Sequence, residues 1–165
     1  MKPPLLISDS GPIISLALLD QLELLTRLFD DVRIPSAVWE ELTEIRFSHD
    51  FSKIAAFFQS RVIKIERENY LFPLAVDYGE SEAMLLYKQM QATCLLIDDK
   101  KARMVAEELG IVCIGTLGLL YRAKERGVIG ELRPLFVTLL RNNRYYAIPI
   151  LNAILEKAQE SIIVM

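Results

Sequence analysis

The sequence predicts an α/β fold in which a mainly parallel sheet is covered by helices on both faces. Short apolar runs alternate with longer amphipathic stretches, which is typical of parallel strands connected by helices. The 165 residues are 52% apolar and 25% charged, enough to bury a core without disulfides or a structural metal. No internal repeat and no Pro-, Gly- or Ser-rich linker divides the chain, so we expect one domain over residues 1–165.

Five short runs of mostly apolar residues are expected to form the strands of this sheet. Such runs are typical of strands that are buried on both faces. The run at 62–65 also contains a lysine, and we expect it to lie at an edge of the sheet. In chain order, the expected strands are residues 5–7, 32–34, 62–65, 94–97 and 111–114.

Nine stretches between and after these runs carry helix signals. Pro12 and Pro35 suit the start of a helix, because proline lacks the N–H that would be unpaired there. Gly110 and Gly127 follow predicted helices where a C-terminal cap adopts a positive φ angle. The expected helices are residues 12–19, 21–29, 35–42, 50–59, 83–90, 100–109, 116–124, 131–142 and 149–160.

The composition argues against several classes of protein. A net charge of −3 provides no overall positive field for nucleic acid or anionic lipid. His49 is the single histidine, and Cys94 and Cys113 lie within apolar runs, so we expect reduced core thiols, no zinc site and no histidine-based hydrolysis. No window reaches the roughly 18 apolar residues that a membrane span needs. We therefore expect a soluble protein of the cytoplasm.

Acidic residues follow the expected strands directly. Asp9 comes after the first strand, and Asp98 and Asp99 come after the fourth. Because ligands of parallel sheets bind beyond the carboxyl ends of the strands, we expect these carboxylates to share one rim. A hard divalent cation would offset their repulsion, and carboxylates without His or Cys favour Mg²⁺ or Mn²⁺. Such an ion can activate water for phosphodiester cleavage.

Each acid also has a purely structural interpretation. In this interpretation, the sole role of Asp9 is to cap the helix that follows it. The sole role of Glu80, Glu82 and Asp99 is to complement helix dipoles. The adjacent glutamates at 40 and 41 could form a solvated helix face. The convergence of acids directly after strands is harder to explain in this way.

Several segments occur in an order and spacing that match a known family. They are ISDSGPII (7–14), IPSAVWEEL (34–42), GESEA (79–83), LLIDDKKAR (95–103) and GTLGLL (115–120) with AK (123–124). Over residues 5 to about 125, the chain resembles the PIN-domain nucleases, especially the toxins of prokaryotic toxin–antitoxin pairs, and among them a little-characterised PIN-like subgroup. The resemblance implies a three-layer α/β/α sandwich with a core of about residues 5–125, followed here by a C-terminal helical extension over about 131–160.

The resemblance further implies a metal-dependent endoribonuclease that uses a cluster of acids. Asp9 matches the acid after the first strand, and Ser10 matches the Ser or Thr that usually follows it. Glu41 matches the glutamate of the helix after the second strand, with Glu40 as the competing alignment.

Two further matches complete the implied site. Glu80 matches the acid that opens the central helix, where many toxins have Asp, and Asp98 or Asp99 matches the acid after the fourth strand. We expect Asp9, Glu80 and Asp98 to hold Mg²⁺ or Mn²⁺, directly or through water. Glu41 and Asp99 are expected to complete or orient that shell.

The sequence also indicates binding partners. Lys100, Lys101 and Arg103 follow the fourth strand, where they could contact the RNA backbone; a solvated helix face is the alternative. A mean hydropathy of +0.27 and apolar stretches in the later helices indicate a protein-facing surface, so a homodimer is expected. The toxin resemblance implies a small antitoxin that covers the acidic crevice.

Two other functions compete with the nuclease. A PIN-like protein could bind RNA or a partner without cutting it. A receiver-like signalling domain would need an early pair of acids and a lysine after a later strand. Thr116 is in a plausible place for such a domain, but Ser8 and Ser10 flank a single acid and no such lysine follows.

Overall fold

A five-stranded parallel sheet organises the part of the chain that the computed structural model describes, residues 4–66 and 76–164. The strand order is β3-β2-β1-β4-β5, and every neighbouring pair is parallel. The strands are β1 (Leu5–Ser8), β2 (Asp31–Pro35), β3 (Val62–Ile63), β4 (Cys94–Leu96) and β5 (Cys113–Ile114). The edge position predicted for residues 62–65 is confirmed.

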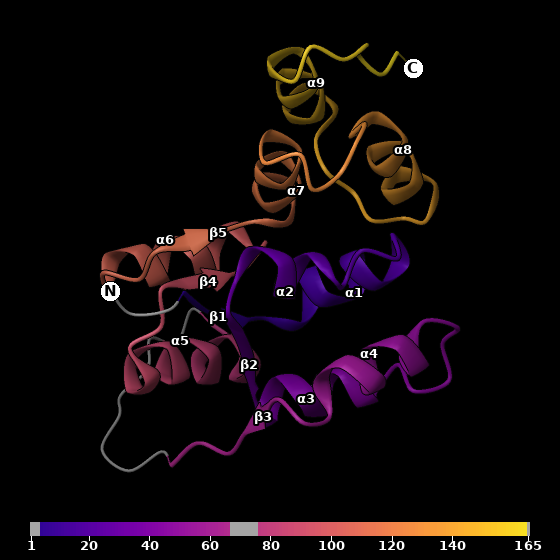
Figure 1. The fold of residues 1–165 in the computed structure, drawn as a ribbon. Helices are drawn as coiled ribbons and strands as arrows, with labels where there is room; N and C mark the ends of the chain where they lie inside the picture. Colours follow the sequence, from indigo (N-terminus) through magenta and orange to yellow (C-terminus); the bar gives the residue numbers. More distant parts are fainter. Residues whose placement is uncertain (1–3, 67–75, 165) are drawn as a thin grey trace.

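Nine helices connect and follow these strands within the described residues (Figure 1). They are α1 (Ser10–Leu18), α2 (Leu24–Leu28), α3 (Ser36–Thr43), α4 (Phe51–Phe58), α5 (Tyr78–Met90), α6 (Lys100–Glu108), α7 (Thr116–Glu125), α8 (Arg133–Arg141) and α9 (Ile148–Lys157). Gly110 and Gly127 have φ angles of +78° and +71°, as expected for residues that end helices.

Helices lie on both sides of the sheet, which confirms the predicted α/β/α sandwich (Figure 1). α5 packs against β1, β2 and β4, while α2 packs against β2 and α6 against β5. α7, α8 and α9 lie together at one end of the molecule, and α7 contacts α1. None of the helices in the described part of the chain is long and apolar enough to cross a membrane.

The path of the chain across the sheet reverses at β1. From β1 the chain first adds β2 and β3 on one side and later adds β4 and β5 on the other. β1 and β4 are therefore neighbours, with Ser8 in register with Leu96. In open parallel sheets, such a reversal leaves a crevice at the carboxyl ends of the two central strands. Asp9 and Asp98 follow these two strands.

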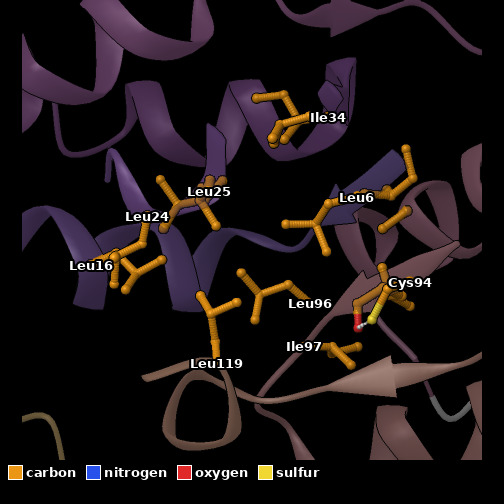
Figure 2. Close-up of a cluster of buried hydrophobic side chains, with 14 of the residues drawn as sticks. Leu6, Leu16, Leu24, Leu25, Ile34, Cys94, Leu96, Ile97 and Leu119 are labelled. Atoms are coloured by element: carbon orange, nitrogen blue, oxygen red, sulfur yellow. Dashed lines mark hydrogen bonds between the residues drawn. The ribbon is translucent and has the colours of Figure 1, made fainter. Parts of the chain in front are cut away.

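The core fills the space between the sheet and the helices around it. The buried cluster includes Leu6 and Leu96 from the strands and Leu16 and Leu119 from the helices, and all four are fully buried (Figure 2). Cys94 and Cys113 are both free cysteines, and burial raises the pKa of each thiol to about 11.

Several helix boundaries differ from those predicted. α5 begins at Tyr78 instead of residue 83, because the side chain of Asp77 caps it. α1 begins at Ser10, two residues before Pro12, so the proline lies within the first turn, where it is still tolerated. These additional turns bring polar residues into the helix starts at the crevice.

The C-terminal helices are bound tightly to the rest of the protein. Phe136 of α8 and Leu151 of α9 are fully buried. Glu160 accepts hydrogen bonds from the backbone N–H groups of Leu132 and Arg133 at 2.9 Å each, and pairs with Lys124 of α7. One carboxylate therefore links the end of the chain to the start of α8 and to α7.

We predict that Phe136→Ala lowers the free energy of unfolding by about 3–5 kcal/mol, because it leaves a cavity under α8. Phe47, with 89% of its surface exposed, supplies the matched control, and Phe47→Ala should change stability by less than about 0.5 kcal/mol. Urea unfolding followed by circular dichroism measures both. A loss below about 1 kcal/mol for Phe136→Ala, or a separate transition for the C-terminal helices, would contradict a shared core.

Candidate active site

Asp9 lies between β1 and α1, at the crevice beside β4. The residue is buried, with 8% of its surface exposed, and its side chain does not cap α1. Burial is the main cause that raises its pKa to about 7; the hydrogen bond of the Ser10 backbone opposes this increase, and the negative charges of Glu41, Asp77 and Asp98 contribute to it. The alternative that Asp9 only caps a helix therefore does not describe this side chain.

Glu41 of α3 is held against the start of α5. The hydroxyl of Ser10 donates to its Oε2 at 2.6 Å. A Cβ atom on Gly79 would lie only 2.0 Å from its Oε1, so glycine at this position leaves the space that the carboxylate occupies. Burial raises the pKa of Glu41, and the charge of Asp77 adds to this effect. Glu40 is exposed, so it is Glu41 that lies with the other acids.

Asp77 and Glu80 form a pair at the start of α5. Asp77 caps the helix by accepting a hydrogen bond from the Glu80 backbone N–H at 2.7 Å. Glu80 has 8% of its surface exposed. Its pKa is raised to about 8, mainly by burial and further by the hydrogen bond and charge of Asp77 and by the charges of Asp9 and Asp99. Sequence reasoning did not assign Asp77 to the site, although its position three residues before Glu80 is typical of a capping box.

Two other predicted acids have structural partners. Asp99 caps α6 by accepting a hydrogen bond from the Ala102 N–H at 2.8 Å. Glu82 is buried and accepts a hydrogen bond from the Ala37 N–H at the start of α3, at 2.9 Å. The capping interpretation thus describes Asp99, although its charge still acts on Glu80.

Asp98 is held by three donors from two other parts of the chain. The N–H of Thr116 donates to its Oδ1 at 2.7 Å, and the Thr116 hydroxyl donates to its Oδ2 at 2.7 Å. The hydroxyl of Tyr146 donates to the same Oδ2 at 2.9 Å. Burial, followed by the charge of Asp98, raises the pKa of Tyr146, so the phenol keeps its proton. The structure therefore distinguishes Asp98, which is fixed at the crevice, from Asp99, which caps a helix.

The predicted basic residues lie at the start of α6. Lys100 and Lys101 are exposed. Arg103 is only partly exposed: a Cβ atom on Gly115 would lie 3.3 Å from its Nη1 and 3.1 Å from Oδ1 of Asp98. Arg103 is thus the basic residue of this group that lies beside an acid of the crevice.

The segment between α8 and α9 also reaches the crevice. Arg144 donates from Nη2 to the Gly11 carbonyl oxygen and from Nε to the Ser15 hydroxyl, at 2.9 Å each. These partners lie about 130 residues away in the chain, so no local pattern could predict the contact. The adjacent residues Arg144, Tyr145 and Tyr146 were the available signal, because they lie in a connection between two predicted helices and binding residues often lie in such connections.

The chemistry of the site fits a hard divalent cation. Its possible ligands are carboxylates, the groups that Mg²⁺ and Mn²⁺ prefer, and neighbouring acids contribute, after burial, to the raised pKa values of Asp9 and Glu80. Across residues 4–66 and 76–164, no three His, Cys, Asp or Glu side chains already surround a point that an ion could fill. Because a carboxyl group must be ionised to bind a metal ion, binding would require Asp9 and Glu80 to release their protons.

The fold and these acids define a nuclease-like α/β protein with a carboxylate site beyond its parallel strands. Residues 5–160 match the family model described as a PIN domain, and the chain belongs to that family. PIN domains are generally nucleases, which supports a hydrolase activity. The match includes α8 and α9, so it extends beyond residue 125, where the resemblance of individual motifs ends. Searches of the curated proteins and of the solved structures gave no match.

We predict that Asp9→Asn stabilises the metal-free protein at pH 8, by roughly 1–3 kcal/mol. The folded protein keeps a proton on Asp9 up to about pH 7, whereas the unfolded chain releases it near pH 4. Stability from this group is therefore present below about pH 4 and is lost as the pH rises through about 7. Asparagine has no charge to bury, so it avoids this loss.

Urea unfolding in EDTA at pH 4 and pH 8 measures this effect. The gain from Asp9→Asn should be large at pH 8 and small at pH 4. Asp30 is exposed, and Asp30→Asn should change stability by less than about 0.5 kcal/mol at either pH. An Asp9→Asn protein that is less stable than wild type at pH 8 would contradict the raised pKa.

Proposed function

We propose that the chain is a metal-dependent endoribonuclease that cleaves RNA phosphodiesters with its cluster of acids. The observation that carries the proposal is the environment of Asp9: a buried carboxyl that makes no cap hydrogen bond lies among acids of α3, of the start of α5 and of the segment after β4. Burying such a group destabilises a fold, and sites with perturbed pKa values in a crevice are typical of catalytic centres. Membership of the PIN family supports the same chemistry.

The residues divide into those that would hold the ion and those that position them. Asp9, Glu80 and Asp98 would hold Mg²⁺ or Mn²⁺, with Glu41 and Asp99 completing the shell. When bound, such an ion lowers the pKa of water and offsets charge on the phosphate oxygens. The hydrogen bonds from Ser10, Thr116 and Tyr146 keep two of these carboxylates turned toward the crevice.

RNA would approach this acidic crevice through local positive charge. Lys100, Lys101 and Arg103 at the start of α6 are proposed to contact the phosphate backbone, with Ser10 as a further polar contact. The metal-free crevice repels a polyanion, so binding should require the ion and should weaken with salt.

The resemblance to toxins supports a role as the toxin of a toxin–antitoxin pair, with a small antitoxin whose basic side chains would cover the crevice. Ile150, Ile162 and Val164 at the C-terminal end are exposed and support a protein contact, for which we propose a homodimer. Two free cysteines are typical of proteins of reducing compartments, so a cytoplasmic location is proposed.

Cleavage of a mixed pool of structured and unstructured RNA tests the proposal. Wild-type protein should cut with Mn²⁺ or Mg²⁺ and not with EDTA. Asp9→Asn should reduce the rate about a hundredfold or more while the protein remains folded, because it removes a carboxylate of the metal site. Product lengths resolved on a gel, together with thermal unfolding of each protein, provide the measurement.

Asp30→Asn is the matched control and should cut RNA at the wild-type rate. Cleavage that persists in EDTA or in Asp9→Asn would contradict the carboxylate mechanism. Folded protein that binds RNA but cuts it with no metal would favour the alternative, a non-catalytic PIN-like binding module.

A further inference from the structure

A pocket lies beside the crevice, between its acids and the segment that joins α8 to α9. Its volume is about 460 Å³, within the roughly 300–1,000 Å³ of sites that hold small organic groups. Its lining residues are Asp98, Asp99, Asn143, Arg144, Tyr145 and Tyr146. One wall is therefore shared with the proposed cleavage site, and the other is the α8–α9 segment.

The wall from the α8–α9 segment is held in place by contacts to two parts of the fold. Arg144 is tied to the Gly11 carbonyl oxygen and to the Ser15 hydroxyl of α1, and Tyr146 is tied to Asp98. In Figure 1 this segment runs between α8 and α1. The pocket is therefore formed before a ligand arrives, which lowers the entropy lost on binding.

Tyr145 presents an aromatic ring to solvent at this pocket. The residue has 77% of its surface exposed, so the ring contributes little to the core. Its hydroxyl donates to Oδ1 of Asn143 at 2.7 Å, and Asn143 has a φ angle of +61° where the chain turns after α8. An exposed ring whose orientation is set by a hydrogen bond is suited to stacking against a flat ligand.

The charges around the pocket favour a nucleobase over a phosphate. The carboxylates of Asp98 and Asp99 repel an anion, but they can accept hydrogen bonds from base N–H groups. Arg144 supplies a planar cation on the same wall, and guanidinium planes also stack on bases. A neutral, planar ring with donors at its edge matches this combination.

We propose that this pocket binds one unpaired base of the RNA strand, stacked on Tyr145, next to the linkage that is cleaved. The inference rests on the proposed function, because it places that base beside the acids of the nuclease site. Single-stranded RNA is the substrate class it implies, since a base must be unstacked from its neighbours to enter. The α8–α9 segment would then position the RNA.

Binding of a short single-stranded RNA, about ten nucleotides long, tests this proposal without cleavage. The protein is the full chain carrying Asp9→Asn, and fluorescence anisotropy at a Mn²⁺ concentration that saturates this variant gives the Kd. Adding Tyr145→Ala should weaken binding about tenfold, whereas Tyr145→Trp should bind within about threefold of the parent. Phe47→Ala is the matched control, because it removes an exposed ring in the α3–α4 connection, away from the α8–α9 segment (Figure 1).

An abasic nucleotide placed at each position in turn identifies the stacked base. At one position the abasic RNA should lose about the same affinity as Tyr145→Ala, and the two losses together should not add, because both remove one interaction. Equal binding by the parent and Tyr145→Ala, additive losses at every position, or no RNA binding by the parent would overturn the proposal.

These outcomes are separate from those of the cleavage test. If Tyr145→Ala weakens RNA binding but the protein cuts no RNA, the base pocket is supported and the nuclease activity is contradicted. If the protein cuts RNA but Tyr145→Ala changes neither the Kd nor the cleavage sites, the nuclease activity is supported and the base pocket is contradicted.

Discussion

The other features of the site depend on one constraint: acidic side chains are buried close together where β1 and β4 end, and they repel one another. The strand order brings Asp9 and Asp98 to the point where the chain reverses its path across the sheet. Glu41 and Glu80 approach from α3 and α5. In the absence of a cation, protons on Asp9 and Glu80 avoid the cost of burying two charges and also relieve the repulsion, and this is why both pKa values are raised.

Hydrogen bonds from the surrounding structure offset part of the cost of bringing these carboxylates together. Ser10 donates to Glu41, and Thr116 and Tyr146 donate to Asp98, so each of these carboxylates keeps hydrogen bonds while it lies near others. Such sites lower the stability of a fold in exchange for function. The buried contacts of α8 and α9 offset part of this loss, and they also place Tyr146 at the crevice.

The fold was predictable because its signals are local. Each of the five strands is a short apolar run, and glycines at 110 and 127 mark the ends of two helices. The order of the strands was not predictable, since it depends on which runs pair across the sheet. The start of α5 was also missed, because the cap from Asp77 outweighs the weak helix propensity of Gly79.

The candidate site was predictable only in part, because some of its contacts join residues that are far apart in the chain. Asp9 and Asp98 could be found because they directly follow strands. The choice of Glu41 over Glu40 depends on the hydroxyl of Ser10, 31 residues earlier in the chain. Tyr146 contacts Asp98 across 48 residues, and no spacing rule connects positions so far apart.

Titration of the wild-type protein with Mn²⁺ at pH 7 tests whether the buried acids release protons when they bind a cation. Calorimetry in buffers of different ionisation enthalpy counts the protons that each ion displaces. We expect binding with release of between about one and two protons, because the pKa of Asp9 is about 7 and that of Glu80 about 8. Asp9→Asn should bind more weakly and release fewer. No binding, or binding that releases no protons, would contradict a site built from buried, protonated acids.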